Sequence, residues 1–220
     1  AQECASADIF AILDQALSEG QRARLSGGDP AMFPKDSLAI AKWSMANHEQ
    51  GVTYCHNGSS PRFVERMLPF TAYAGIDLKG SNPHELAMRS GIKDHLGSPM
   101  MQRSLESQRI LSEAGVPTDV RTCVFGSTTT YEMLKMADLV AENGDPNNKV
   151  WTVRQYIAVP GIPWQSPHPE KLQKQVQLVS RAHPELTVAF RPHWQGGGME
   201  FWRGGERFNP PAISESILAS

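Results

Sequence analysis

The sequence alternates between strand-like and helix-like segments, and this alternation limits the folds open to the chain. Short apolar runs typical of strands occupy residues 52–55, 72–78, 120–125, 150–158 and 186–190. Helical patterns lie between and before them, at residues 6–20, 36–47, 100–114, 131–143 and from 166 onward. Ser60 followed by Pro61 predicts the start of a further, short helix. Strands that alternate with helices of this length predict βαβ units around a parallel sheet. Right-handed crossovers then allow either an open doubly wound sheet or a barrel.

Length and charge limit the function classes. The chain has 220 residues, with 21 Lys and Arg against 23 Asp and Glu, so its formal net charge is −2. This balance argues against a broad basic face for nucleic acid. We see no apolar run long enough to span a membrane and no signal peptide. Three scattered cysteines (Cys4, Cys55 and Cys123) argue against a disulfide framework, so we expect a reducing, cytoplasmic setting without membrane partners.

Glycines and polar residues follow several of the predicted strands. The carboxyl ends of parallel strands meet at one edge of a sheet, so these residues should gather there. Gly27 and Gly28 remove two Cβ atoms and would let backbone approach a ligand closely, although Gly-Gly alone is more typical of a tight strand-to-helix turn. Asp29 would add a carboxylate suited to an ammonium or hydroxyl group. The segment lacks the spacings of the common phosphate-binding loops.

Charged residues also occur within the predicted strands. Asp77 and Lys79 are two residues apart and would face the same side, where they could pair with each other or meet a ligand. Arg121 offers a planar guanidinium suited to a carboxylate. Arg154 and Gln155 are adjacent, so only one of them can point inward. The alternatives are an ion pair that closes the end of the barrel, or solvated strand residues.

Other chemistry finds little support in the sequence. The seven histidines form no compact metal-ligand spacing, and no Gly-x-Ser-x-Gly segment is present. Cys55 and Cys123 lie in hydrophobic strands, where we expect buried structural thiols.

Taken in order, four segments resemble motifs of the radical SAM superfamily. Residues 26–30 (SGGDP) are similar to its "GGE" segment, and Asn57-Gly58 to the end of its "TNG" strand. Residues 76–79 (IDLK) are similar to its "DLK" strand, and 110–122 to the following helix and strand, where an Arg is common. The resemblance covers residues 6–190. It is closest to the glycyl-radical-enzyme activases, especially the type that activates anaerobic ribonucleotide reductase.

The resemblance implies a partial (β/α) barrel of parallel strands over residues 1–194, followed by an irregular tail over 195–220. It implies S-adenosylmethionine (SAM) held against a [4Fe–4S] cluster, and reductive cleavage of SAM to a 5′-deoxyadenosyl radical that abstracts hydrogen. A flavodoxin or ferredoxin would supply the electron, and a glycyl radical enzyme or another protein would be the partner. The residues that it implies for the cofactor site are Gly27, Gly28, Asp29, Pro30, Asn57, Asp77, Lys79, Arg121 and Gln155.

The sequence departs from the family at the cluster. The CxxxCxxC loop and the first barrel strand are absent, and only Cys4 comes near the spacing of the third ligand. Either the sequence begins downstream of that loop or the protein has lost the cluster. In the "TNG" strand, Cys55 and His56 stand where activases carry Asp and Thr, which argues against a monovalent-cation site.

Three function classes therefore remain open. The first is a radical SAM enzyme, acting on a protein or on a small molecule or nucleotide. The second is a cluster-free barrel that acts as a binding or partner protein. The third is an ordinary α/β enzyme with an anion site in the late strands, for which Gly126 and Ser127 are the only hint.

Overall fold

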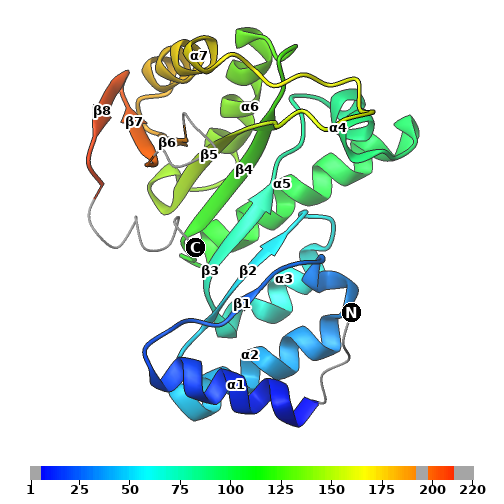
Figure 1. Cartoon of the computed structure of the whole chain (residues 1–220), viewed down its shortest axis with the longest axis vertical. Helices are drawn as coiled ribbons and strands as arrows, with labels where there is room; N and C mark the ends of the chain where they lie inside the picture. The colour runs from blue at the N-terminus through cyan, green and yellow to red at the C-terminus, as the bar shows by residue number, and fades with distance from the viewer. Residues whose placement is uncertain (1–5, 192–197, 211–220) are drawn as a thin grey trace.

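The computed structural model describes residues 6–191 and 198–210 and consists of helices and one sheet (Figure 1). The helices are α1 (Ser6–Ser18), α2 (Pro34–His48), α3 (Pro61–Met67), α4 (Pro83–Ser90), α5 (Gly97–Glu113), α6 (Thr130–Glu142) and α7 (Pro169–Ala182). The strands are β1 (Arg24–Leu25), β2 (Val52–His56), β3 (Thr71–Asp77), β4 (Thr118–Val124), β5 (Lys149–Gln155), β6 (Thr187–Phe190), β7 (Glu200–Arg203) and β8 (Glu206–Phe208).

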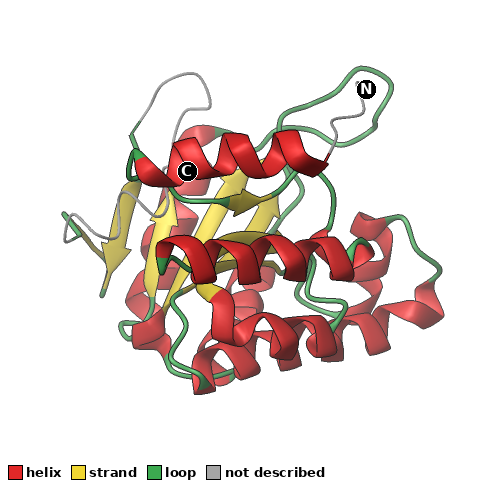
Figure 2. Ribbon diagram, turned by 90° about the horizontal axis from the view of Figure 1, so that it is seen from below, coloured by secondary structure: helices red, strands yellow, loops and turns green. Residues whose placement is uncertain are grey.

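The sheet follows the order of the chain, from β1 to β8. Strands β1 to β6 pair in parallel, as the alternation of strands and helices predicts. Strands β7 and β8 are antiparallel and extend the sheet beyond β6. Figure 2 shows the strands side by side in one twisted layer, with helices along it. The arrangement is an open, partial barrel, which confirms the predicted fold class.

The core lies between the sheet and the helices and forms two apolar clusters. One joins β4, β5 and β6 to α6 and α7, and includes Trp151, Val153, Phe190, Met133 and Val176. The other joins β2 and β3 to α2, α3 and α5, and includes Tyr54, Ile76, Ala41, Phe63 and Leu111. Since strand side chains alternate between faces, this packing uses one face of the sheet and leaves the other for polar groups.

Several predicted boundaries are confirmed and others are wrong. Ser60 caps α3, accepting a hydrogen bond from the Phe63 amide at 3.3 Å, as its position before a proline predicts. The second helix begins at Pro34 rather than near Asp36, and the last begins at Pro169 rather than at Ser166–Pro167. Helix α4 was not predicted, although Asn82 before Pro83 is a capping signal and its side chain accepts from the Glu85 amide.

The predicted irregular tail is wrong for residues 200–208, which form the β7–β8 hairpin. Gly204 and Gly205 both have positive φ, at 61° and 85°, and make the tight turn that joins the two strands. Residues 195–197 and 211–220 of that segment lie outside the described residues. In residues 6–191 and 198–210, none of the helices has the length and hydropathy that crossing a lipid bilayer requires.

Candidate functional site

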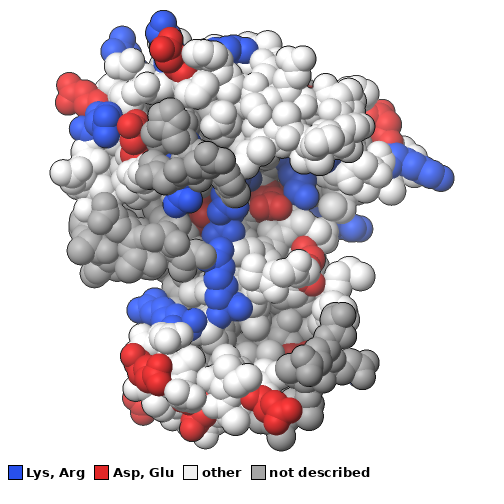
Figure 3. All heavy atoms as spheres, in the orientation of Figure 1, with Lys and Arg blue, Asp and Glu red and all other residues white. Residues whose placement is uncertain are grey.

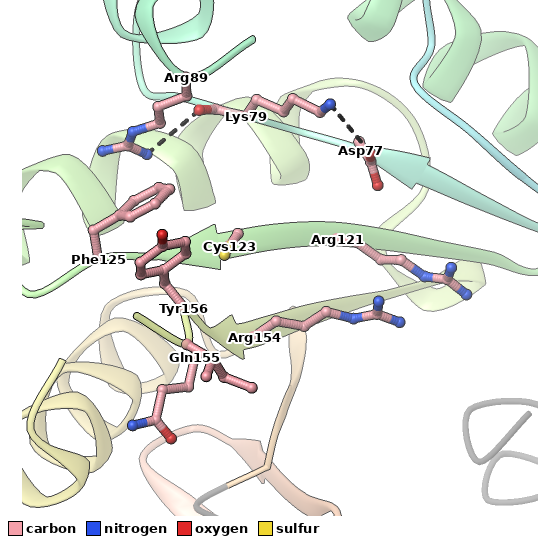
Figure 4. A pocket seen from close by; sticks show the side chains of 10 residues that line it. Asp77, Lys79, Arg89, Arg121, Cys123, Phe125, Arg154, Gln155 and Tyr156 are labelled. Atoms are coloured by element: carbon pink, nitrogen blue, oxygen red, sulfur yellow. Dashed lines mark hydrogen bonds and ion pairs between the residues drawn. The ribbon is translucent and has the colours of Figure 1, made fainter. Parts of the chain in front are cut away.

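A cavity of about 470 Å³ opens at the carboxyl ends of β3, β4 and β5. Figure 3 shows Lys and Arg side chains gathered around a hollow in the middle of this face. The cavity is lined by Asp77, Lys79, Arg89, Arg121, Cys123, Phe125, Arg154, Gln155, Tyr156 and Ile157 (Figure 4). Its volume falls within the usual range for small-molecule sites, about 300–1,000 Å³.

Strand β4 shows how the sequence builds this polar face. Val120 and Val124 belong to the apolar core, whereas Asp119, Arg121 and Cys123 alternate with them and face the other way. Cys123 is exposed and lines the cavity, so the prediction of a buried thiol there is wrong. Val120 and Val124 of the same strand explain the error, because these apolar residues pack on the opposite face.

Asp77 and Lys79 form an ion pair, one of the two arrangements that their spacing allows. Their side chains lie on the same side of the chain, with Lys79 Nζ 3.7 Å from Asp77 Oδ2 (Figure 4). Burial raises the pKa of Asp77 above its ordinary value, although Lys79 and Arg121 act in the opposite direction. Asp77 is thus a half-buried hydrogen-bond acceptor with the cations Lys79 and Arg121 nearby.

Two side chains, those of Asp119 and Cys55, fix the position of Arg121 in the cavity wall. Its guanidinium donates to the Asp119 carboxylate, and Nη1 donates to Cys55 Sγ at 2.6 Å. Burial alone would lower the pKa of Arg121, but Asp119 reverses this effect and raises it. Gly75 of β3 leaves room for the guanidinium, since a Cβ at Gly75 would lie 2.6 Å from Arg121 Cζ. Cys55 is half-buried and also accepts from Arg24 Nη2 at 3.2 Å.

Arg89 of α4 lines one side of the cavity, and no motif or spacing in the sequence pointed to it. Its guanidinium lies 3.6 Å from Glu85, donates to the Lys79 carbonyl at 3.4 Å, and sits 5.2 Å from the centre of the Phe125 ring. Tyr156 packs against Phe125 with ring centres 4.7 Å apart. This side of the cavity therefore combines a fixed cation with an aromatic wall.

Arg154, rather than Gln155, faces inward from β5. Arg154 is paired in register with Cys123, and residues in register share a face. Gln155 borders the cavity, but its amide nitrogen donates to the Pro167 carbonyl at 3.0 Å. In the described part of the chain, the Arg154 guanidinium makes neither a hydrogen bond nor an ion pair.

The loop after β1 is organised by Asp29. Its Oδ1 accepts from the Ala31 amide at 2.9 Å and lies 2.7 Å from His56 Nδ1, while Oδ2 accepts from the Asn57 amide at 3.0 Å. Burial by itself raises the pKa of Asp29, but the hydrogen bonds from His56 and Asn57 outweigh it, so the pKa lies below its ordinary value. Pro30 begins the short 3-10 helix that Asp29 caps, and Gly27 and Gly28 are exposed.

His56 connects this loop to α3. Its ring is buried beside Phe63, and its Nε2 accepts from the Ser60 amide at 3.2 Å. Because Nε2 is an acceptor, Nδ1 carries the hydrogen and donates to Asp29. Asn57 borders a second cavity of about 140 Å³, which Asp77 and Lys79 also line. The loop and the larger cavity are therefore neighbours, although Asp29 does not line the latter.

The described residues do not fit a [4Fe–4S] cluster. Residues 6–191 and 198–210 contain no group of three His, Cys, Asp or Glu side chains that could hold a metal ion. Cys55 and Cys123 lie on different strands, β2 and β4. Cys4, the predicted ligand, lies outside the described residues. No role in metal binding is therefore assigned to a described residue.

The backbone of Gly126, one of the two residues of the predicted anion site, is not free to bind a ligand. The Gly126 amide donates to the Gln165 carbonyl at 2.8 Å, and Lys171 Nζ donates to the Gly126 carbonyl at 3.0 Å. Both backbone groups of Gly126 are thus already bonded within the chain.

No protein-family profile matches the sequence, and no curated protein matches it. Solved structures do match the fold. A domain of the pyruvate-formate lyase-activating enzyme from Bacteroides vulgatus has a TM-score of 0.60 and 16% identity, over 77% of this chain and 98% of that one. SuiB from Streptococcus suis bound to S-adenosylmethionine has a TM-score of 0.64 and 16% identity, over 87% of this chain.

A radical SAM methyltransferase from Sphaerobacter thermophilus has a TM-score of 0.63 and 15% identity, over 86% of this chain. The chain spans 44% of the length of SuiB and 57% of that of the methyltransferase. These similarities show that the chain has the fold of these proteins, as the sequence motifs led us to expect.

Proposed function

From this shared fold, we propose that the chain is part of a radical SAM enzyme and binds SAM at the carboxyl ends of β3, β4 and β5. The observation that carries the proposal is the cavity that Asp77, Lys79 and Arg121 share, in a fold also adopted by a protein solved with SAM. When bound and reductively cleaved, SAM supplies a radical that abstracts hydrogen.

The lining residues fit the polar groups of SAM. Asp77 offers carboxylate oxygens to an ammonium or to ribose hydroxyls, and Lys79 and Arg121 offer donors to a carboxylate. Phe125 and Tyr156 offer an apolar wall. Because the ion pairs with Asp77 and Asp119 already hold the two cations, they would need little reorganisation when the ligand binds.

We further propose that the enzyme activates a glycyl radical enzyme and takes its electron from a flavodoxin or ferredoxin. The motif resemblance supports this role, and so does the similarity to a domain of an enzyme that activates pyruvate-formate lyase. The role of Gly27, Gly28, Asp29, Pro30, Asn57 and Gln155 in holding SAM stays a prediction of the same kind. A [4Fe–4S] cluster is part of the proposal, but its ligands are not assigned to described residues.

SAM binding is the first test. Equilibrium dialysis with labelled SAM should show saturable binding to the chain. Replacing Asp77 with Asn should weaken it about tenfold or more, because a hydrogen bond to a charged group contributes about 1.5–3 kcal/mol. Arg66→Gln is the control, since Arg66 is exposed on α3 and lines neither cavity. A folded chain without saturable SAM binding would contradict the proposal.

Catalysis is the second test. After anaerobic treatment of the full-length gene product with iron and sulfide, a reductant should release 5′-deoxyadenosine from SAM. A glycyl radical detected on the partner by electron paramagnetic resonance would support the activating role. SAM binding without any release of deoxyadenosine would instead favour a cluster-free binding protein.

A further inference from the structure

Three of the four cations that line the cavity are balanced by acidic side chains of the chain itself. Lys79 lies beside Asp77, and the buried Arg121 lies beside Asp119. Arg89 is likewise held by Glu85. Arg154 is the exception, since it contacts no acidic side chain among residues 6–191 and 198–210. A guanidinium keeps its charge at any ordinary pH, so Arg154 brings to the cavity a positive charge that no acidic side chain contacts directly, although it acts on Asp77 at longer range.

The position of Arg154 adds to this charge. Its side chain lies on the same face of the sheet as that of Arg121, on the neighbouring strand. Figure 4 shows both guanidinium groups extending toward the same end of the cavity. Two like charges that face one space repel each other, and an oxyanion between them would convert this repulsion into charge-assisted hydrogen bonds.

SAM alone does not complement such a surface. At neutral pH its sulfonium and ammonium groups outnumber its single carboxylate, so it is a net cation. Adding it to a cavity in which three of the four cationic side chains are paired and Arg154 is not increases the excess of positive charge. A second ligand with negative charge would offset this excess.

We therefore propose that the cavity binds a substrate that carries an oxyanion, a phosphate or a carboxylate, with Arg154 as its main ligand. The inference rests on the proposed function, because it names the substrate class for the same site; in a glycyl radical enzyme the oxyanion would be a side-chain carboxylate close to the target glycine. The apolar part of the substrate packs against the wall of Phe125, Tyr156 and Ile157. Because the substrate and SAM carry opposite net charges, each strengthens the binding of the other, and this coupling is reciprocal.

Calorimetry on the chain without iron tests this inference. The probes are phenyl phosphate, benzoate and neutral benzyl alcohol, which share a ring and differ in charge. Phenyl phosphate or benzoate should bind, and benzyl alcohol should bind far more weakly. Whichever anion binds more tightly identifies the oxyanion that the site prefers.

The variant Arg154→Gln should weaken binding of the anionic probe about ten- to a hundredfold, the usual loss for a hydrogen-bonded charge pair. The control Arg66→Gln should leave it unchanged. Arg154→Lys retains the charge without the planar fork and should give an intermediate loss. Circular dichroism and a melting curve establish that each variant is folded, as expected for a side chain without a partner in the described chain.

The same titrations separate this inference from the proposed function. If anions bind through Arg154 but SAM does not bind with or without them, the proposed function fails and the anion site stands. If SAM binds, but the anionic probe binds equally to the protein and to Arg154→Gln, or does not tighten SAM binding, the inference fails.

Discussion

Two acidic residues at strand ends, Asp29 after β1 and Asp77 at the end of β3, show how differently one residue type is used on the same edge of the sheet. Asp29 accepts three hydrogen bonds from within the chain, and its pKa is lowered. Asp77 has one ion pair at 3.7 Å and borders two cavities, and its pKa is raised. Asp29 is therefore mainly part of the scaffold, and Asp77 has acceptor capacity to spare.

The difference shows that a polar residue at a strand end is not by itself a ligand. An ionised carboxylate has about four acceptor positions, so Asp29 has about one left for anything outside the chain. The SAM ammonium that the motif resemblance assigns to Asp29 would have to use that remaining position. For Asp77 the same ammonium, or a ribose hydroxyl, would meet a carboxylate that the chain leaves largely free.

The largest expected effect comes from exchanging each carboxylate for an amide. In Asp29→Asn an amide NH₂ must face either the His56 Nδ1 hydrogen or a backbone amide, which leaves a buried donor unsatisfied. We expect the free energy of unfolding to fall by about 3 kcal/mol. Asp77→Asn should change it by less than about 1 kcal/mol, as for other partly exposed ion pairs. Denaturant titration measures both, and equal losses would refute the distinction.

A second, smaller effect compares the stability cost of adding a Cβ at Gly75, beside Arg121, with the cost of adding one in the loop after β1. A Cβ at Gly75 would collide with the Arg121 guanidinium, which Asp119 holds in place, so Gly75→Ala should cost about 2 kcal/mol. The matched control is Gly28→Ala, because a Cβ there meets no atom within 4 Å and φ is not in the left-handed region. It should change stability by less than about 0.5 kcal/mol. The opposite ranking in thermal melts would contradict the packing described for Arg121.

The smallest effect is a pair of opposite pH dependences. The pKa of Asp29 is lowered by folding, so its contribution to stability is complete above about pH 4 and is lost as the pH falls through the folded pKa. The pKa of Asp77 is raised by folding, so its carboxyl adds stability as the pH falls from neutral toward about 4. Unfolding curves from pH 7 to pH 3 should change in opposite senses in Asp29→Asn and Asp77→Asn.

Local patterns in the sequence predicted those features of the fold and site that depend only on residues close in sequence. The pairing of Asp77 with Lys79 followed from the two-residue repeat of a strand, and the start of α3 followed from Ser60 before a proline. The same two-residue repeat could have predicted the side of the sheet to which Arg154 points. Trp151 and Val153 mark the apolar face of β5, and Gln155 continues it, so Arg154 had to point the other way.

Contacts between distant segments could not be predicted in this way. Two of the three partners of Asp29, His56 and Asn57, are 27 and 28 residues away in sequence, and those of Arg121 include Cys55, 66 residues away. Arg89 reaches the cavity from a helix whose position depends on the packing of α4 against α5. The β7–β8 hairpin had a local signal in Gly204-Gly205, which lies between Phe201-Trp202 and Phe208, but the Gly and Pro content of the segment favoured an irregular tail.

The sheet does not close on itself, and both of its borders are short in the described part of the chain. The first border is β1, with two residues, and the other is β8, with three. An unpaired strand of such length offers a neighbouring molecule few backbone groups on which to add a strand of its own. The two borders of the described sheet therefore have little tendency to pair edge to edge with a second copy of the chain.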